Sequence, residues 1–295
     1  MKLYLIFVLF LVSTLFIYST VNAQDTDGAV TFHIYSIHTS FPDTGRAKGH
    51  LYENKLYAAN EHYNDSIVLI IAPKNLNVKK KVDLVFWFHG WGNNVDSAAI
   101  RYELIKQFIA SKRNAVLILA ETARNAPDSY GGKLENPGVF KGLVADILQG
   151  LKRKKLIPEN GASGHILLGG HSGANRVIAR IIKNGEMPID EAMLFDALYS
   201  ETPIFIDWLK ADKQHRFIHL STNHGYGPLE ESLAMMKLLD DDDVDYLKIE
   251  ETALVPVQLR VHNIVFIHSL KEHNDIVNPD NFRLMLENNS FLKAL

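Results

Sequence analysis

The stretch ILLGGHSGANRV, residues 166–177, has an apolar strand, a turn with a serine at its apex, and the start of a helix. Gly170 and Ala174 lie two residues before and two residues after Ser172. A sharp strand-to-helix turn strains the backbone at its apex, so both of these positions must carry small residues. The stretch therefore predicts a nucleophile elbow, with alanine in place of the last glycine of the usual G-x-S-x-G pattern.

Strands and helices alternate on both sides of this stretch. The runs 82–88 and 115–120 are almost continuously apolar, which is typical of strands buried on both faces of a sheet. Beyond the first strands, the alternation predicts parallel strands with helices on both faces of one α/β domain, residues 24–295. The expected strands are 29–37, 66–72, 82–88, 115–120, 165–169, 192–195, 216–220 and part of 255–268. The expected helices are 97–111, 140–151, 174–182, 201–211, 229–239 and 281–288.

The first 23 residues have the pattern of a secretory signal peptide. Lys2 is followed by an apolar run to Tyr18, and Val21 and Ala23 supply small residues before a cut after Ala23. The apolar run is shorter than the roughly 20 residues that span a bilayer, although an uncleaved anchor is the alternative. We expect a secreted or periplasmic protein with no stable membrane anchor after signal cleavage.

The composition excludes several classes of function. The chain has no cysteine, so neither disulfides nor thiol catalysis can contribute. A net charge of −3 gives no reason to expect nucleic acid as a partner. The sequence contains no G-x-x-x-x-G-K-[ST] phosphate loop, and its histidines show no metal-ligand spacing. We therefore expect neither a cofactor nor a metal.

Four candidate groups for an active site follow predicted strands. They are His89-Gly90, Ser172, Asp196 and His273, in that order along the chain. Sites in open parallel sheets form at the carboxyl ends of the strands, so these groups are expected to meet. The order Ser…Asp…His is the one found in α/β-hydrolases.

The chain resembles an α/β-hydrolase of the serine esterase and lipase type from about Val82 to its C-terminus. The resemblance rests on the motifs FHGWG at 88–92, GHSGA at 170–174 and KEHND at 271–275. It implies a three-layer fold with a mostly parallel central sheet. It also implies site residues: Ser172 as nucleophile, His273 as base, Asp196 as acid, and an oxyanion hole formed by Gly173 with Trp91 or Gly90.

The base and the acid have rivals in the sequence. His268 and His224 are the alternatives to His273. Most members of the resembled fold carry the acid one strand later than Asp196, but the corresponding loop here has no carboxylate before Glu230. Glu230 is therefore the second choice for the acid, ahead of the acidic run 240–243.

These features together predict an exported serine hydrolase that cleaves a carboxylic ester through an acyl-enzyme. The alternatives are an amidase, a peptidase or an acyltransferase on the same fold, or a hydrolase-like binding protein without catalysis. The segment between Asp196 and Arg216 is too short for a cap domain, which suggests an open site for a small-molecule or polymeric ester. Trp91, Tyr130 and Tyr199 are candidate walls of that site.

Overall fold

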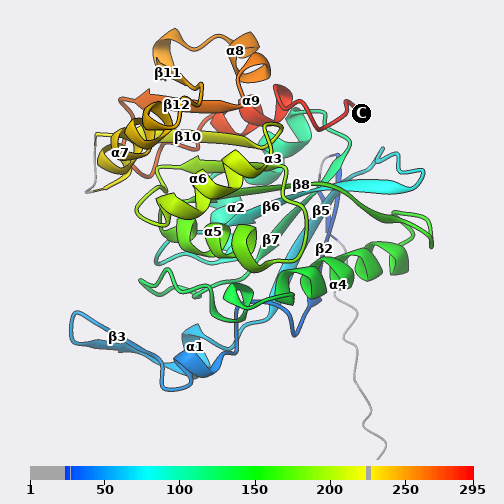
Figure 1. Cartoon of the computed structure of the whole chain (residues 1–295). Coiled ribbons are helices and arrows are strands. Elements are labelled where there is room, and N and C mark those ends of the chain that lie inside the picture. The colour runs from blue at the N-terminus through cyan, green and yellow to red at the C-terminus, as the bar shows by residue number, and fades with distance from the viewer. Residues whose placement is uncertain (1–23, 27, 224–226) are drawn as a thin grey trace, which may run out of the picture.

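The computed structural model describes residues 24–26, 28–223 and 227–295, so the predicted signal peptide and His224 lie outside the described residues. Its centre is a ten-stranded sheet with the strand order β1-β2-β5-β7-β6-β8-β9-β10-β12-β11 (Figure 1). The strands of this sheet are β1 Gln24–Thr26, β2 Ala29–Tyr35, β5 Ile67–Pro73, β6 Lys81–Phe88, β7 Ala115–Ala120, β8 Ala162–His171, β9 Glu191–Phe195, β10 Arg216–Thr222, β11 Leu247–Glu250 and β12 Ile264–Ser269.

The sheet is antiparallel at one side and parallel over the rest. Pairs β1–β2, β2–β5 and β5–β7 are antiparallel. From β7 through β6, β8, β9, β10 and β12 to β11, every pair is parallel. The parallel part carries all the predicted site residues, because each follows one of these strands.

Helices cover both faces of the sheet and make three layers. Helices α4 to α7 pack on one face with Phe86, Phe140 and Phe205 in the core. Helices α2, α3, α8 and α9 pack on the other face around Trp87 and Phe282. The predicted three-layer α/β architecture is confirmed. The helices are α1 Ala59–His62, α2 Val95–Arg101, α3 Leu104–Ala110, α4 Val139–Arg153, α5 Asn175–Asn184, α6 Thr202–Ala211, α7 Pro228–Asp241, α8 Pro256–Val261 and α9 Asn281–Glu287.

The predicted helix 97–111 is in fact two helices. The break between α2 and α3 falls at Glu103, which has φ 46° and so cannot continue a right-handed helix. The side chain of Tyr102, at the end of α2, is buried. The apolar pattern runs without interruption through the break, so it gave no sign of the turn.

The region 255–268 also differs from the expectation of one strand. Its first part is α8, and only Ile264–Ser269 forms a strand. Pro256 begins α8, a position where its fixed φ and missing N–H cost nothing. The sequence also missed β11, a four-residue strand at the edge of the sheet whose side chains are only partly buried.

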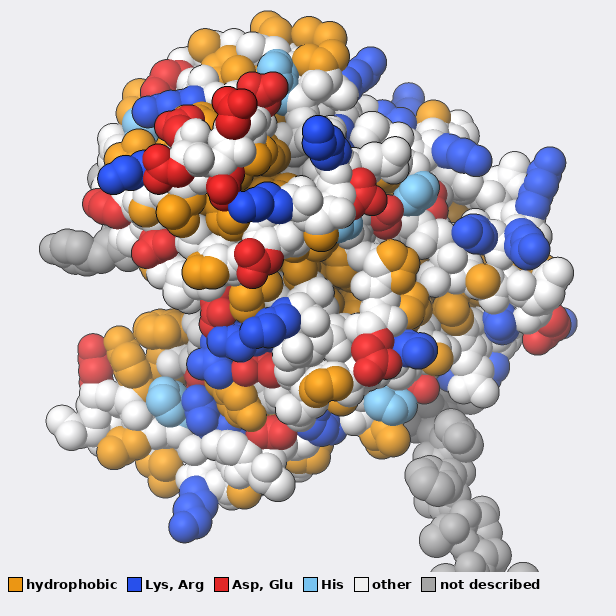
Figure 2. Space-filling model, in the orientation of Figure 1, with side chains coloured by type: hydrophobic (Ala, Val, Ile, Leu, Met, Phe, Trp, Pro, Cys, Tyr) orange, Lys and Arg blue, Asp and Glu red, His pale blue; other side chains and the backbone are white. Residues whose placement is uncertain are grey.

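A hairpin that the sequence left unassigned projects from the body of the molecule. It consists of β3 (His50–Tyr52) and β4 (Lys55–Tyr57), and we call residues 50–57 the arm. Figure 1 shows the arm extending away from the central sheet, and Figure 2 shows a deep notch between it and the part of the body above. Within the described part of the chain, no helix is both long enough and apolar enough to span a membrane.

Candidate active site

Ser172 lies at the sharp turn between β8 and the helices that follow. Its φ is 56°, a left-handed conformation that is unusual for a residue other than glycine. The turn continues as a single 3₁₀ turn, Ser172–Ala174, and then as α5. A Cβ atom at Gly170 would lie 2.6 Å from the Cβ of Ala174. This contact explains why the two positions flanking the serine carry small residues.

Asp196 and His273 are joined by a hydrogen bond. The Nδ1 atom of His273 lies 2.6 Å from Oδ2 of Asp196. A carboxylate only accepts, so Nδ1 carries the proton and donates it. In the neutral imidazole, Nε2 is then left with the lone pair that a general base needs.

Thr222, at the end of β10, is a second partner of Asp196. Its main-chain N–H donates to Oδ1 and its hydroxyl donates to Oδ2, both at 2.8 Å. Burial raises the pKa of the Asp196 carboxyl, but the hydrogen bonds from His273 and Thr222 outweigh burial and hold that pKa below its usual range. Asp196 is therefore a carboxylate at neutral pH. Thr222 was not predicted, because it lies on a different strand from Asp196 and the sequence alone does not show that the two residues are in contact.

The backbone of the sheet places Ser172 and Asp196 at neighbouring strand ends. His171 and Phe195 are register partners in the parallel pair β8–β9. Ser172 and Asp196 are the next residues along each strand, and both have positive φ, at 56° and 47°. The ladder between β8 and β9 thus brings the two side chains to the same edge of the sheet.

Tyr199 lies close to the predicted nucleophile. Burial and then the nearby Asp196 carboxylate raise the pKa of Tyr199 to about 12, while the neighbouring Ser172 side chain acts in the opposite direction. The sequence suggested Tyr199 only as a wall of the site. Its hydroxyl is in fact a polar neighbour of Ser172.

Gly90 and Gly173 lie in close contact with other parts of the site. A Cβ atom at Gly90 would be 2.7 Å from the Cβ of Ser172, and one at Gly173 would be 2.6 Å from Cδ1 of Trp91. The loop after β6 therefore packs directly against the elbow, and the indole of Trp91 covers Gly173. Only glycine fits at either position without a shift of its neighbours.

His89 orients the peptide bond between Gly90 and Trp91. Its Nδ1 lies 2.8 Å from the carbonyl oxygen of Gly90, and its Nε2 lies 2.5 Å from Oε1 of the buried Glu121. A trans peptide is planar, with its C=O and N–H in opposite directions. Because the Gly90 carbonyl points to His89, the N–H of Trp91 points away from it.

The rival residues have other partners. His268 contacts Oε2 of Glu250 through Nδ1, at 2.6 Å, and Oδ1 of Asn223 through Nε2, at 2.7 Å. Glu230 accepts the N–H of Gly227 at the start of α7. Of the candidate histidines and carboxylates that lie within the described residues, the structure brings together His273 and Asp196.

The arm reaches the site through one pair of aromatic rings. The Tyr52 ring lies edge-on to the ring of Trp91, with centroids 5.4 Å apart. The indole N–H of Trp91 donates to Oγ of Ser129 at 2.7 Å. Trp91 is nevertheless 48% exposed, so a large aromatic surface is open to solvent beside Gly173. The arm and the loop containing Ser129 thus hold Trp91 from two sides.

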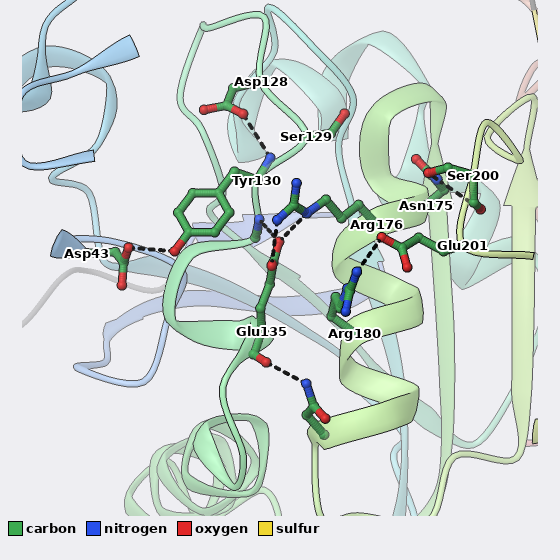
Figure 3. A network of polar contacts seen from close by, with 12 residues as sticks. Asp43, Asp128, Ser129, Tyr130, Glu135, Asn175, Arg176, Arg180, Ser200 and Glu201 are labelled. Carbon is green, nitrogen blue, oxygen red and sulfur yellow. Dashed lines mark hydrogen bonds and ion pairs between the residues drawn. The ribbon is translucent and has the colours of Figure 1, made fainter. Parts of the chain in front are cut away.

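A polar network ties this loop to the helix that follows the elbow (Figure 3). Arg176, in the first turn of α5, donates from Nε and Nη2 to the two carboxylate oxygens of Glu135, at 2.7 and 2.8 Å. The Tyr130 hydroxyl donates to Asp43 at 2.8 Å, and Arg176 lies over the Tyr130 ring, 5.2 Å from its centroid. Tyr130, a predicted wall, thereby connects the elbow helix to the segment leading to the arm.

Across residues 24–26, 28–223 and 227–295, no group of three or more His, Cys, Asp or Glu residues could hold a metal ion.

No protein-family model matches this sequence, and no curated protein matches it. Solved structures do resemble the fold. One is FphF, a fluorophosphonate-binding serine hydrolase of Staphylococcus aureus, at 10% identity with a TM-score of 0.53, covering 89% of this chain and 98% of that one. Another is a ferulic acid esterase at 11% identity with a TM-score of 0.53, covering 86% and 93%. Together with the strand order and the three layers, this likeness shows that the chain has the α/β-hydrolase fold.

Proposed function

We propose that the protein is a serine hydrolase that cleaves carboxylic esters with Ser172, His273 and Asp196. The observation that carries the proposal is the 2.6 Å hydrogen bond between Asp196 and His273, at the sheet edge where Ser172 occupies a strained turn. A serine hydroxyl becomes a good nucleophile only when a base takes its proton. The donor role of Nδ1 leaves Nε2 of His273 for this purpose.

The proposed reaction has two steps. Oγ of Ser172 attacks the ester carbonyl carbon while His273 takes the hydroxyl proton. The tetrahedral intermediate expels the alcohol, which receives that proton from His273, and the acyl group stays on Ser172. Water then attacks the acyl-enzyme by the same route and releases the acid. Throughout, Asp196 fixes the His273 tautomer and stabilises the imidazolium that forms.

The amides of Gly173 and Trp91 are the proposed oxyanion donors. Their location beside Ser172 supports this role, since two N–H groups aimed at the developing charge provide much of the rate enhancement in acyl transfer. The Gly90 carbonyl is held by His89, which favours the amide of Trp91 over that of Gly90 as the second donor.

Export and an open site belong to the same proposal. The signal-peptide pattern of residues 1–23 supports secretion or delivery to the periplasm. Between Asp196 and β10 the chain forms only α6 and its connections, and the notch beside the arm adds to the opening (Figure 2). This arrangement favours an ester carried on a bulky molecule.

Labelling with a fluorophosphonate tests the chemistry directly. We expect the wild type to be labelled and the Ser172→Ala variant to be unlabelled at equal protein concentration, with both equally folded. A panel of acetate, butyrate and longer acyl esters, with matched amides, would then separate ester from amide cleavage. Absence of labelling in the folded wild type would contradict an activated serine and favour a binding protein instead.

A further inference from the structure

His171 connects two parts of the molecule beneath the candidate site. It is the last residue of β8, immediately before Ser172, and its side chain is only 3% exposed. Its Nε2 lies 2.8 Å from the main-chain carbonyl oxygen of His273. Its Nδ1 lies 3.0 Å from the hydroxyl of Tyr102, at the break between α2 and α3. The reaction proposed above uses neither His171 nor Tyr102.

The chemistry of the partners fixes the direction of both hydrogen bonds. A carbonyl oxygen can only accept, so Nε2 of His171 carries a proton and donates a hydrogen bond to the main-chain carbonyl of His273. Burial, and then the nearby His273, lower the pKa of His171 to about 3, so the ring is neutral and has one N–H. Its Nδ1 must therefore accept from the Tyr102 hydroxyl. Burial raises the pKa of Tyr102 to about 12, which keeps that hydroxyl protonated.

The α2–α3 junction that holds Tyr102 is also bound to the chain beyond His273. The Tyr102 carbonyl accepts from Nε2 of Gln107 at 2.8 Å, and the same nitrogen lies 3.2 Å from the carbonyl of Val277. Oε1 of Gln107 accepts the N–H of Arg283 at 3.0 Å. The junction is thus fixed to the segment that carries the base, and it presents the Tyr102 hydroxyl from a buried position.

We propose that Tyr102 and His171 are positioning residues that hold His273 by its main chain while Asp196 holds its ring. This inference rests on the proposed function, in which His273 is the base. The His171 and His273 rings also pack against each other, with centroids 4.5 Å apart. Because His171 adjoins Ser172, one strand end sets the location of both the nucleophile and the backbone of the base.

Substitutions at His171 separate the hydrogen bond from packing. His171→Leu removes the donor to His273, whereas His171→Gln can still offer a side-chain N–H to that carbonyl. We expect His171→Leu to lower kcat and the fluorophosphonate labelling rate by about 10- to 100-fold with little change in KM, the scale expected for a misplaced catalytic group. His171→Gln should recover most of the rate at a similar melting temperature. Equal losses in the two variants at equal stability, or wild-type rates in His171→Leu, would overturn the proposal.

Tyr102→Phe is the milder test, because it removes one hydroxyl from a buried ring. Without that donor the Nδ1–H tautomer of His171 can compete, and this tautomer cannot bind the His273 carbonyl. We expect a rate about fivefold lower, the scale of one lost hydrogen bond. A Tyr102→Phe variant with the wild-type rate would show that the hydroxyl does not position the base.

Nitrogen NMR of the histidine rings gives a readout that needs no activity. The resonances lost in His171→Gln identify His171, which should be a neutral Nε2–H tautomer from about pH 5 to about pH 8. A charged ring or the Nδ1–H tautomer would overturn the proposal even if the enzyme is active. If the tautomer is as expected but the folded wild type is not labelled, the proposed function fails and the positioning role fails with it.

Discussion

Thr222 donates two hydrogen bonds to Asp196, one from its main chain and one from its hydroxyl, both at 2.8 Å. The carboxylate that holds His273 is therefore itself held by the neighbouring strand β10. Such support matters because a catalytic group must stay within a fraction of an ångström of its productive position.

Removing the Thr222 hydroxyl should cost stability in a pH-dependent way. The pKa of Asp196 is below its unfolded value of about 4, so its ionisation stabilises the fold above that pH. This stabilisation is lost as the pH falls through the lower, folded pKa. We expect Thr222→Val to lower the free energy of unfolding by about 1 kcal/mol at pH 7, and by less in acid. Urea unfolding at a series of pH values measures this, with Thr222→Ser, which keeps the hydroxyl, as the control. An equal loss at every pH would contradict the link to Asp196.

The two glycines beside Trp91 should respond differently to alanine. A Cβ at Gly90 would lie 2.7 Å from Ser172, whereas a Cβ at Gly92 would meet nothing within 4 Å. Gly90→Ala should displace the elbow and lower kcat/KM by at least about 100-fold. Gly92→Ala should cost only about 1 kcal/mol of stability, because its φ of 65° strains a residue with a side chain. Ester hydrolysis and thermal unfolding of both variants give the comparison. Similar activity in the two would mean that the loop after β6 does not pack on the elbow as described.

The buried pair Glu191–Arg216 offers a stability test away from the reacting atoms. Nε of Arg216 lies 2.9 Å from Oε2 of Glu191, and both side chains are almost wholly buried. Burial raises the pKa of Glu191 to about 7, so the pair is fully charged only at higher pH. At about pH 9, Glu191→Gln would leave the guanidinium without its charged partner and should cost about 3–5 kcal/mol. Replacing both, as Glu191→Gln with Arg216→Met, should cost less than Glu191→Gln alone. Denaturant unfolding measures both variants, and a double variant less stable than Glu191→Gln would contradict this account.

Tyr52 should affect catalysis although it lies on the arm. Its ring packs edge-on against Trp91, and such aromatic pairs contribute about 1 kcal/mol. Loss of the ring in Tyr52→Ala should therefore free the indole and lower kcat/KM by about fivefold. Tyr52→Phe keeps the ring and should retain the wild-type rate. Ester hydrolysis at matched protein stability tests this pair, and an unchanged rate in Tyr52→Ala would show that the arm does not control Trp91.

Much of the fold follows from patterns that are local in the sequence. The apolar run 115–120 became β7, and the apolar stripe from Phe140 to Leu151 became the buried face of α4. The small residues around Ser172 correctly indicated a sharp turn after a strand. Each of these patterns depends on the backbone geometry of one element, so the sequence of that element is sufficient.

The features that were missed depend on contacts between distant residues. The break at Glu103 interrupts a continuous apolar pattern, and Tyr102 beside it binds His171, 69 residues later. His171 and His273 are separated by 102 residues. A polar residue at a strand end is a weak signal, which could have drawn attention to Thr222 but could not identify its partner. The arm has short strands without apolar alternation, so no periodicity marked it.

The ladder between β8 and β9 determines which parts of this protein can vary, in evolution or by mutagenesis, without moving Ser172 relative to Asp196. Ser172 and Asp196 each follow a register partner of that ladder, so their separation is set by main-chain hydrogen bonds inside a buried sheet. Insertions and replacements in surface loops leave that separation untouched. The arm and the Ser129 loop are two such segments: they lie outside the ladder, and both contact Trp91 beside the site. Substitutions there can alter which molecules bind while the spacing of the proposed nucleophile and acid is preserved.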